Sequence, residues 1–248
     1  MTNMKGAIIA AGRGSRLNSS GGKKIPKPLY KIFDKPIIYW VVDAMKRANI
    51  KNIFIVLGYK GQMIQEYFGD GDDYGVNITY VYNSSYKKDL IYSVQTLRPY
   101  LNKEKEFILS MADQLYDPNI LVKFSKVKLP LNSILLCVDK KFDQIFDIDD
   151  ATKILVSKND NKILSSHGKI IKNYDYVDCG LHKYSAAIFE AINDLSKGNN
   201  LTANKVLNYL GKKAKASIWD LGDKKWADID TIADLNAAET KMNNILLK

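Results

Sequence analysis

The sequence predicts an α/β fold with a mostly parallel, Rossmann-like open sheet, flanking helices and a small β-hairpin insertion. In roughly the first 115 residues, short apolar runs rich in small and branched side chains alternate with amphipathic stretches of helical period. Strands that alternate with helices pair in parallel through right-handed crossovers. Further along the chain, two alternating runs flank a cluster of turn residues, which is typical of a hairpin.

The predicted elements of the first half follow one another in strict alternation. The expected strands are buried, apolar runs and lie at 6–11, 51–59, 76–83 and 106–113. The expected helices lie between them at 36–50, 60–71 and 90–101. The first helix carries one apolar stripe, formed by Ile37, Trp40, Val41, Ala44, Met45 and Ala48.

The second half is less regular. We expect one more sheet strand over 132–140, an extended segment over 174–185, and the hairpin insertion over 151–170 with its turn at 159–162. Helices are predicted over 185–198, ended by Gly198, and over 202–213, capped by Thr202. A hairpin-like pair over 216–230 and a helix that starts near Thr231 complete the predicted elements.

Composition excludes some classes of protein. The net charge of +10 suits nucleic acid, a membrane surface or a phosphorylated small molecule, but only Arg13, Arg16, Arg47 and Arg98 are arginines, which disfavours specific nucleic-acid binding. No run approaches the roughly 20 apolar residues of a membrane span, and the first strand begins too early for a secretion signal. We therefore expect a cytoplasmic protein. The sequence has two cysteines and two histidines, without metal-type spacing, which disfavours a zinc site.

The loop after the first strand reads AAGRGSRLNSSGGKKIPKPL, residues 10–29. In an open parallel sheet, the turn after the first strand is the usual phosphate site. Gly12 and Gly14 let backbone amides approach an anion, while Arg13, Arg16 and Lys27 add positive charge. No glycine-lysine-serine/threonine ending marks a Walker loop, and no third glycine completes a dinucleotide fingerprint. We interpret the loop as a triphosphate cradle; a tight strand-to-helix turn would explain the glycines alone.

Three ordered motifs carry a resemblance to a known family. AAGRGSRL followed by KIPKPL closely resembles the signature of nucleotidyltransferases that join a nucleoside triphosphate to a phosphorylated sugar, alcohol or phosphonate. LSMADQLYDP, with Asp113, and WADIDTIADLNAAE, with Asp228 and Asp230, occur where that family has its other motifs. The resemblance implies the nucleotide-diphospho-sugar transferase fold. It also implies one domain over 1–248, with a nucleotide-binding half at 1–120 and an acceptor-binding half with the metal motif at 121–248.

The resemblance assigns roles to individual residues. It implies catalytic roles for Arg16, Lys27 and Asp113. The residues implied to bind the nucleotide are Ala10, Ala11, Gly12, Arg13, Gly14, Ser15, Arg16, Lys27, Asn83, Ser93 and Ala112.

The chemistry of transfer gives an independent reason for the carboxylates. Attack of a phosphate oxygen on the α-phosphorus joins two anionic reactants, so the site needs Mg²⁺ on oxygen ligands and cations on the triphosphate. We expect Asp113, Asp228 and Asp230 to hold this metal, and strand alternation places Asp228 and Asp230 on one face. No general base is required, because the attacking phosphate is ionised at neutral pH.

The acceptor half resembles one branch of the family. The segments VDKKFDQIFDIDDATKILV and SSHGKIIKNYDYVDCGLHKYS look most like inositol-1-phosphate cytidylyltransferases. By that resemblance, CTP is the nucleotide, Lys169 and Lys153 bind the phosphate of inositol 1-phosphate, and Asp178, with Gly180 beside it, faces the inositol hydroxyls. A carboxylate suits vicinal hydroxyls, and a lysine suits a phosphate.

Alternatives remain open at this point. Leu90 and Ile91 stand where relatives carry an asparagine-glycine step that helps to frame the base. The same chemistry would serve phosphocholine, an aminoalkylphosphonate or a sugar 1-phosphate with CTP, UTP or dTTP. A third hypothesis is a non-catalytic nucleotide-binding or nucleic-acid-binding domain. Such cytidylyltransferases are often fused to a membrane alcohol transferase, and here we expect a separate enzyme to use the product. A homodimer is one option for assembly.

Overall fold

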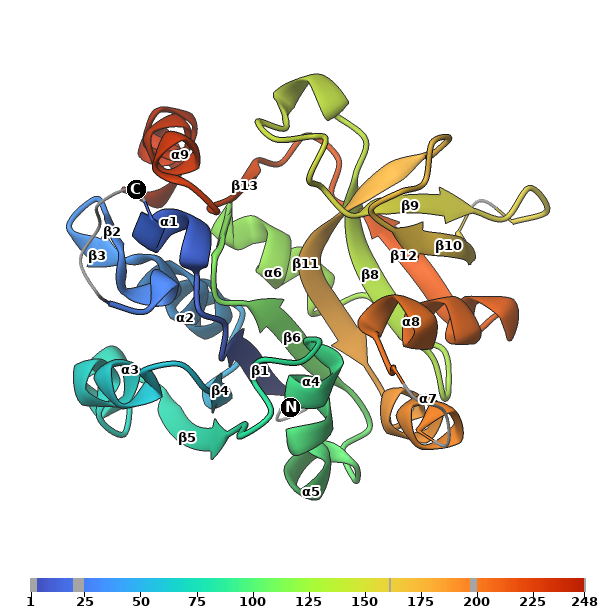
Figure 1. Ribbon diagram of the computed structural model, residues 1–248, viewed down its shortest axis with the longest axis horizontal. Coiled ribbons are helices and arrows are strands. Elements are labelled where there is room, and N and C mark those ends of the chain that lie inside the picture. Colours follow the sequence, from blue (N-terminus) through green and yellow to red (C-terminus); the bar gives the residue numbers. More distant parts are fainter. Residues whose placement is uncertain (1–3, 20–24, 161, 197–199, 248) are drawn as a thin grey trace.

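The computed structural model describes residues 4–19, 25–160, 162–196 and 200–247 (Figure 1). Within them, the main sheet has nine strands, in the order β10-β9-β11-β6-β1-β4-β5, with β8 beside β11 and β12 beside β8. The predicted fold class is thereby confirmed. The division into a nucleotide-binding and an acceptor-binding half stays a prediction.

The parallel part of the sheet comes from the first half of the chain. β1 (Lys5–Ala10) lies between β4 (Asn52–Leu57) and β6 (Phe107–Met111), and β5 (Asn77–Tyr82) pairs with β4, all in parallel. The connecting helices are α2 (Ile37–Arg47), α3 (Gly61–Phe68), α4 (Ile91–Thr96) and α5 (Arg98–Leu101), with a 3-10 turn, η2 (Asp72–Tyr74). The single helix predicted over 90–101 is divided at Leu97, because Pro99 has no amide hydrogen to continue α4 and instead lies in the first turn of α5.

The antiparallel part is centred on β11 (Tyr176–Tyr184). β11 pairs with β6, β8 (Ile134–Asp139) and β9 (Lys153–Val156), always antiparallel. β9 and β10 (Leu164–Gly168) form the predicted hairpin. Its turn includes Asn161, which lies outside the described residues, as does Gly198, the predicted end of α7 (Ala187–Leu195).

The hairpin predicted over 216–230 is wrong. β12 (Ala216–Asp220) pairs in parallel with β8, whereas β13 (Trp226–Asp228) pairs with β7 (Gln114–Tyr116) in a separate two-stranded sheet. Gly222, with φ of 70°, does turn the chain, but each flanking segment finds a different partner. The indole of Trp226 donates to buried Asp139 at 2.8 Å, which fixes the start of β13. The chain thus leaves the main sheet and brings Asp228 opposite Gln114.

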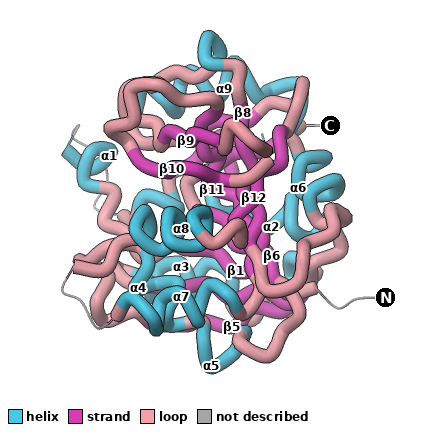
Figure 2. The backbone as a smooth tube through the Cα atoms, turned by 90° about the vertical axis from the view of Figure 1, so that its right-hand side faces the viewer, coloured by secondary structure: helices cyan, strands magenta, loops and turns pink. Residues whose placement is uncertain are grey.

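Helices cover both faces of the main sheet, as Figure 2 shows. Alternate residues of β1 face different cores: Ala7 and Ile9 pack with α4, α7 and α8 (Ala203–Lys212), and Ile8 and Ala10 pack with α2, α3 and α6 (Pro118–Phe124). Thr202 caps α8 as predicted, because its side chain accepts from the Lys205 amide. No helix in the described part of the chain has the length and apolar character needed to span a bilayer.

A third core joins the two ends of the chain. α1 (Ser15–Ser19) and α9 (Ile232–Leu246) contribute Leu17 and Met242, which cluster with Trp40 of α2. Thr231 begins α9, as predicted, through a capping box with Asp234. Three small elements complete the fold: β2 (Lys31–Ile32), β3 (Lys35–Pro36) and the 3-10 turn η1 (Lys27–Leu29). The consequence is that the chain around α1 lies close to the segment that leads from β13 into α9, at the upper left of Figure 1.

Candidate active site

The glycine-rich loop lines a cavity of about 290 Å³ where β1 and β6 end. Predicted nucleotide-binding residues supply much of its wall: Ala10, Ala11, Gly12, Gly14, Ser15, Arg16, Lys27, Ser93 and Ala112. Asn83 lies behind this wall, where its amide donates to the Ser93 hydroxyl at 2.8 Å. Arg13 is exposed in the loop. Tyr86 and Lys88, which sequence reasoning missed, also line the cavity.

Gly14 explains how Lys27 reaches this cavity. Gly14 has φ of 58°, and a Cβ atom there would lie 2.3 Å from Cβ of Lys27. Only a glycine fits both the backbone conformation and the close approach. The Lys27 side chain is therefore packed against the loop and almost fully buried, with its ammonium directed at the carboxylates.

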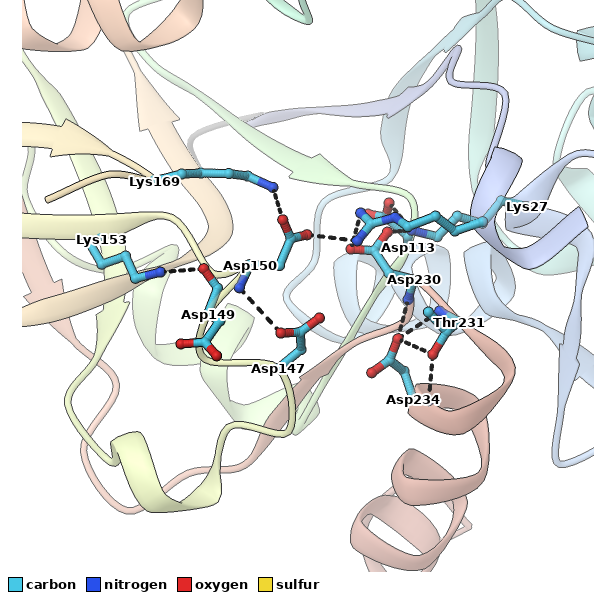
Figure 3. A network of polar contacts seen from close by, with 11 residues as sticks. Lys27, Asp113, Asp147, Asp149, Asp150, Lys153, Lys169, Asp230, Thr231 and Asp234 are labelled. Carbon is cyan, nitrogen blue, oxygen red and sulfur yellow. Dashed lines mark hydrogen bonds and ion pairs between the residues drawn. The ribbon is translucent and has the colours of Figure 1, made fainter. Parts of the chain in front are cut away.

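Lys27 lies among three carboxylates. Its Nζ is 2.7 Å from Oδ2 of Asp113 and also pairs with Asp230 (Figure 3). Burial alone would lower the pKa of Lys27, but the negative charges of the three carboxylates outweigh it and raise the pKa above its usual value. Lys27 therefore stays protonated at neutral pH.

The carboxylates of Asp113, Asp228 and Asp230 form a compact set. One oxygen of each lies within 4.8 Å of the others. Asp228 is exposed at the cleft, but many protein atoms surround its carboxylate and remove part of its solvation. This removal from bulk water, together with the charges of Asp113 and Asp230, raises the pKa of Asp228 to about 8. Ionisation of all three carboxylates at once is therefore unfavourable even beside Lys27.

A magnesium ion fits this set. Mg²⁺ prefers carboxylate oxygens, and within the described residues no other group of three or more acidic, histidine or cysteine side chains gathers its ligand atoms so closely. Asp113, Asp228 and Asp230 are the residues that would hold it, as the sequence predicts.

Asp150 connects the two sides of the cleft. Its carboxylate accepts from Nη1 of Arg16 at 2.8 Å and from Nζ of Lys169 at 2.6 Å, and Nη2 of Arg16 lies 2.7 Å from Asp230 (Figure 3). Partial burial opposes ionisation, but the Lys169 and Arg16 contacts prevail and lower the pKa of Asp150. Asp150 lies within the segment VDKKFDQIFDIDDATKILV, in which the sequence predicts a role for Lys153 but none for this aspartate.

A second cavity, of about 370 Å³, adjoins the first. Leu90, Met111, Asp113 and Asp230 line both, so the cavities meet at the carboxylates. Three of the four predicted acceptor-binding residues, Lys169, Asp178 and Gly180, line the second cavity. The fourth, Lys153, is not among the described residues that line this cavity. Its ammonium instead donates to the Asp149 carbonyl at 2.6 Å (Figure 3). The 3-10 turn η3 (Phe142–Gln144) lies at the edge of this cavity.

Asp178 is held by two histidines. Nε2 of His167 lies 2.8 Å, and Nε2 of His182 2.9 Å, from the carboxylate, and the Gly180 amide donates to it at 2.8 Å. Burial would raise the pKa of Asp178, but His182 and then His167 hold it well below its usual value. The sequence predicts no role for either histidine beyond the absence of zinc-type spacing. Their spacing gives no signal, since the contact of His167 with Asp178 needs β10 and β11 to lie on the two sides of β9.

Comparison with known proteins places these features in a family context. The sequence model of the family described as nucleotidyl transferase matches residues 5–138. The D-glycero-alpha-D-manno-heptose 1-phosphate guanylyltransferase of Campylobacter jejuni is 29% identical over 221 residues, covering 88% of this chain and 91% of that relative. A bifunctional IPC transferase and DIPP synthase of Rubrobacter xylanophilus is 25% identical over 235 residues. That alignment covers 94% of this chain, which spans about half the length of the bifunctional relative.

A solved structure is similar along the whole chain. The inositol-1-phosphate CTP transferase from T. maritima superposes with a TM-score of 0.81 at 26% identity, covering 99% of this chain and 96% of that one. The superposed part includes the segments of this chain that line the two cavities, because it covers nearly every residue.

Proposed function

The chain belongs to the nucleotidyl transferase family, and from that premise we propose that it transfers a cytidylyl group from CTP to inositol 1-phosphate. The products would be CDP-inositol and pyrophosphate. The coarser statement, a nucleotidyltransferase that acts on a sugar or polyol phosphate, follows from the family and from relatives that match most of the chain. The choice of base and acceptor is the proposal.

The observation that carries the proposal is the junction of the two cavities. Asp113 and Asp230 line both, with Lys27 between them. A triphosphate held by the glycine-rich loop and an acceptor phosphate held near Lys169 would meet at this junction. Transfer needs this arrangement, because the attacking oxygen and the α-phosphorus must be brought within contact distance.

The reaction itself is a displacement at phosphorus. An oxygen of the acceptor phosphate forms a bond to the α-phosphorus, while the bond from that phosphorus to the bridging oxygen breaks and pyrophosphate leaves. Arg16 and Lys27 would neutralise charge on the triphosphate as it develops. Bound Mg²⁺ would add positive charge next to the same oxygens, held by the three carboxylates.

Relatives support two acceptor classes. The T. maritima inositol-1-phosphate CTP transferase and the bifunctional IPC transferase relatives favour CTP with an inositol phosphate. The heptose 1-phosphate guanylyltransferase, at 29% identity over most of both chains, favours a sugar 1-phosphate with GTP as the second candidate. The segments VDKKFDQIFDIDDATKILV and SSHGKIIKNYDYVDCGLHKYS, which contain Asp150 and Asp178, resemble the first class, so we place it ahead.

A grid of substrates tests the proposal. Pyrophosphate release is measured with Mg²⁺ while CTP, UTP, dTTP, ATP and GTP are crossed with inositol 1-phosphate, phosphocholine, aminoethylphosphonate and glucose 1-phosphate. We expect release with CTP and inositol 1-phosphate. Asp113→Asn is the inactive control. Release with another pair alone would move the assignment within the family, and with GTP and a sugar 1-phosphate it would favour the second candidate.

A further inference from the structure

Gln114 is a buried polar residue in the wall of the larger cavity. It follows Asp113, opens β7 and lies opposite Asp228 in the register with β13. Only 5% of its surface is exposed, and its side chain fits there because Gly180 has no side chain: a Cβ at Gly180 would lie 3.2 Å from Cγ of Gln114. The Gln114 side chain therefore fills space that a side chain at position 180 of β11 would restrict.

The orientation of the Gln114 amide is set by Asp228. The Gln114 side chain donates a hydrogen bond to that carboxylate, so the NH₂ group faces Asp228. The opposite orientation would place Oε1 against carboxylate oxygens and is unfavourable. The amide oxygen is thereby directed away from Asp228.

This oxygen has no donor in the protein. Among the described residues, Oε1 of Gln114 is the one buried side-chain nitrogen or oxygen without a hydrogen-bond partner. Native proteins rarely leave such an atom unpaired, because it has lost its water without compensation. A partner from outside the chain resolves this, and the residue lines the cavity in which the proposed function places the acceptor.

The neighbouring acceptor groups in this wall are already engaged. The oxygens of Asp178 accept from His167, from His182 and from the Gly180 amide. Oε1 of Gln114 remains, a neutral acceptor that suits a neutral donor such as an alcohol hydroxyl. A quaternary ammonium carries no N–H or O–H and cannot donate to it.

We propose that Gln114 accepts a hydrogen bond from an acceptor hydroxyl and thereby selects polyhydroxylated phosphates, such as an inositol or sugar phosphate, over phosphocholine. The inference rests on the proposed function, since it requires the acceptor to occupy the larger cavity. Gln114 is then a specificity-determining residue beside the metal carboxylates. Asp178, fixed by its histidines, shapes the wall next to it.

The test compares Gln114→Met with Gln95→Met. Both change a glutamine to a residue of similar size, but Gln95 is exposed on α4 and lines neither of the two cavities. For Gln114→Met at saturating Mg²⁺, kcat/KM for inositol 1-phosphate should fall about tenfold, the usual effect of one lost hydrogen bond, with KM for CTP unchanged. Saturating Mg²⁺ is used because the variant also loses the amide that donates to Asp228. Gln95→Met should match the wild type. Gln114→Leu replaces Gln114→Met if the latter does not fold.

Binding without catalysis gives a second readout. Calorimetry of inositol 1-phosphate in EDTA should show the same loss of affinity for Gln114→Met. A series of monodeoxy-inositol 1-phosphates identifies the contacted hydroxyl. The compound that lacks it should bind the wild type more weakly than inositol 1-phosphate does, whereas Gln114→Met should bind the two compounds equally. Unchanged affinity for inositol 1-phosphate, or an effect on KM for CTP instead, would overturn the proposal.

The two proposals fail differently. If the wild type uses a sugar phosphate in place of inositol 1-phosphate, the acceptor assignment fails, and the Gln114 comparison is made with that sugar phosphate, where the same tenfold loss is expected. If the wild type turns over only phosphocholine or aminoethylphosphonate, the role of Gln114 as a hydroxyl acceptor is contradicted.

Discussion

The guanidinium of Arg16 donates to the carboxylate of Asp150 at 2.8 Å, although 134 positions separate the two residues. The contact joins the glycine-rich loop to the segment before β9, across the mouth of the cleft. Asp150 also accepts from Lys169, so one carboxylate neutralises two cations that we expect to bind substrate phosphates. We therefore expect Asp150 to compete with substrate phosphates for these two cations.

Removal of the Asp150 charge should strengthen anion binding. Asp150→Asn keeps a polar side chain of the same size but frees the charges of Arg16 and Lys169 for phosphate. The affinity for CTP in EDTA should rise by up to about fivefold at low salt, a modest effect because the pair is partly exposed. Calorimetry at two salt concentrations measures it, with Asp223→Asn, an exposed aspartate, as control. Weaker binding by Asp150→Asn would contradict this interpretation.

Lys27 should act mainly on the rate. A cation that stabilises charge in the transition state affects kcat more than ground-state binding. We expect Lys27→Met to lower kcat by roughly 100-fold or more while KM for CTP changes little. Steady-state kinetics with Lys31→Met, an exposed lysine, as control measure the effect. A normal kcat would remove Lys27 from the catalytic site.

Loss of Lys27 should also make the fold depend more on Mg²⁺. The three carboxylates would then face one another without a cation, and a bound divalent ion would relieve their repulsion. The rise in Tm on addition of Mg²⁺ should be larger for Lys27→Met than for the wild type. An equal rise in both proteins would show that Lys27 does not offset the carboxylate charge.

Alanine substitutions at the two loop glycines should have different effects, one on the thermal stability of the fold and the other on nucleotide binding. A Cβ at Gly14 would collide with Lys27, whereas a Cβ at Gly12 would meet no atom of the described residues within 4 Å. Gly14→Ala should therefore lower Tm by several degrees, since φ is positive there. Gly12→Ala should keep Tm and weaken CTP binding, because its methyl group projects into the cradle. The same Tm loss in both variants would contradict this distinction.

Asp228 should contribute to metal binding, and in the absence of a bound metal ion its charge should destabilise the folded protein. Its raised pKa reflects removal of the carboxylate from water and, after that, repulsion from Asp113 and Asp230. Asp228→Asn should therefore raise Tm in EDTA and increase the Mg²⁺ concentration needed for half-maximal turnover. Thermal denaturation and a Mg²⁺ titration measure the two effects. A lower Tm in EDTA together with a normal Mg²⁺ requirement would exclude Asp228 from the metal site.

The sequence predicts the parallel sheet well, because β1, β4 and β6 are continuous buried runs, β5 carries buried Ile78 and Val81, and α2 has an apolar stripe. It predicts the 216–230 segment wrongly, since turn residues around Gly222 do not reveal that β12 and β13 have different partners. The motifs locate Lys27 and the three carboxylates. The roles of Asp150 and His167 are not predicted, because their contacts depend on the tertiary structure. Asp150 pairs with Arg16, 134 positions away, and His167 contacts Asp178 only because β10 and β11 lie on the two sides of β9.

The central claim is direct transfer across the junction of the two cavities, and mass spectrometry of the products tests it most directly. CTP and inositol 1-phosphate are incubated with the enzyme and Mg²⁺, and the nucleotide products are identified. We predict CDP-inositol and pyrophosphate in equal amounts, with both absent for Asp113→Asn. Formation of CMP and pyrophosphate in place of a diphosphate-linked product, at a rate independent of the acceptor, would contradict it.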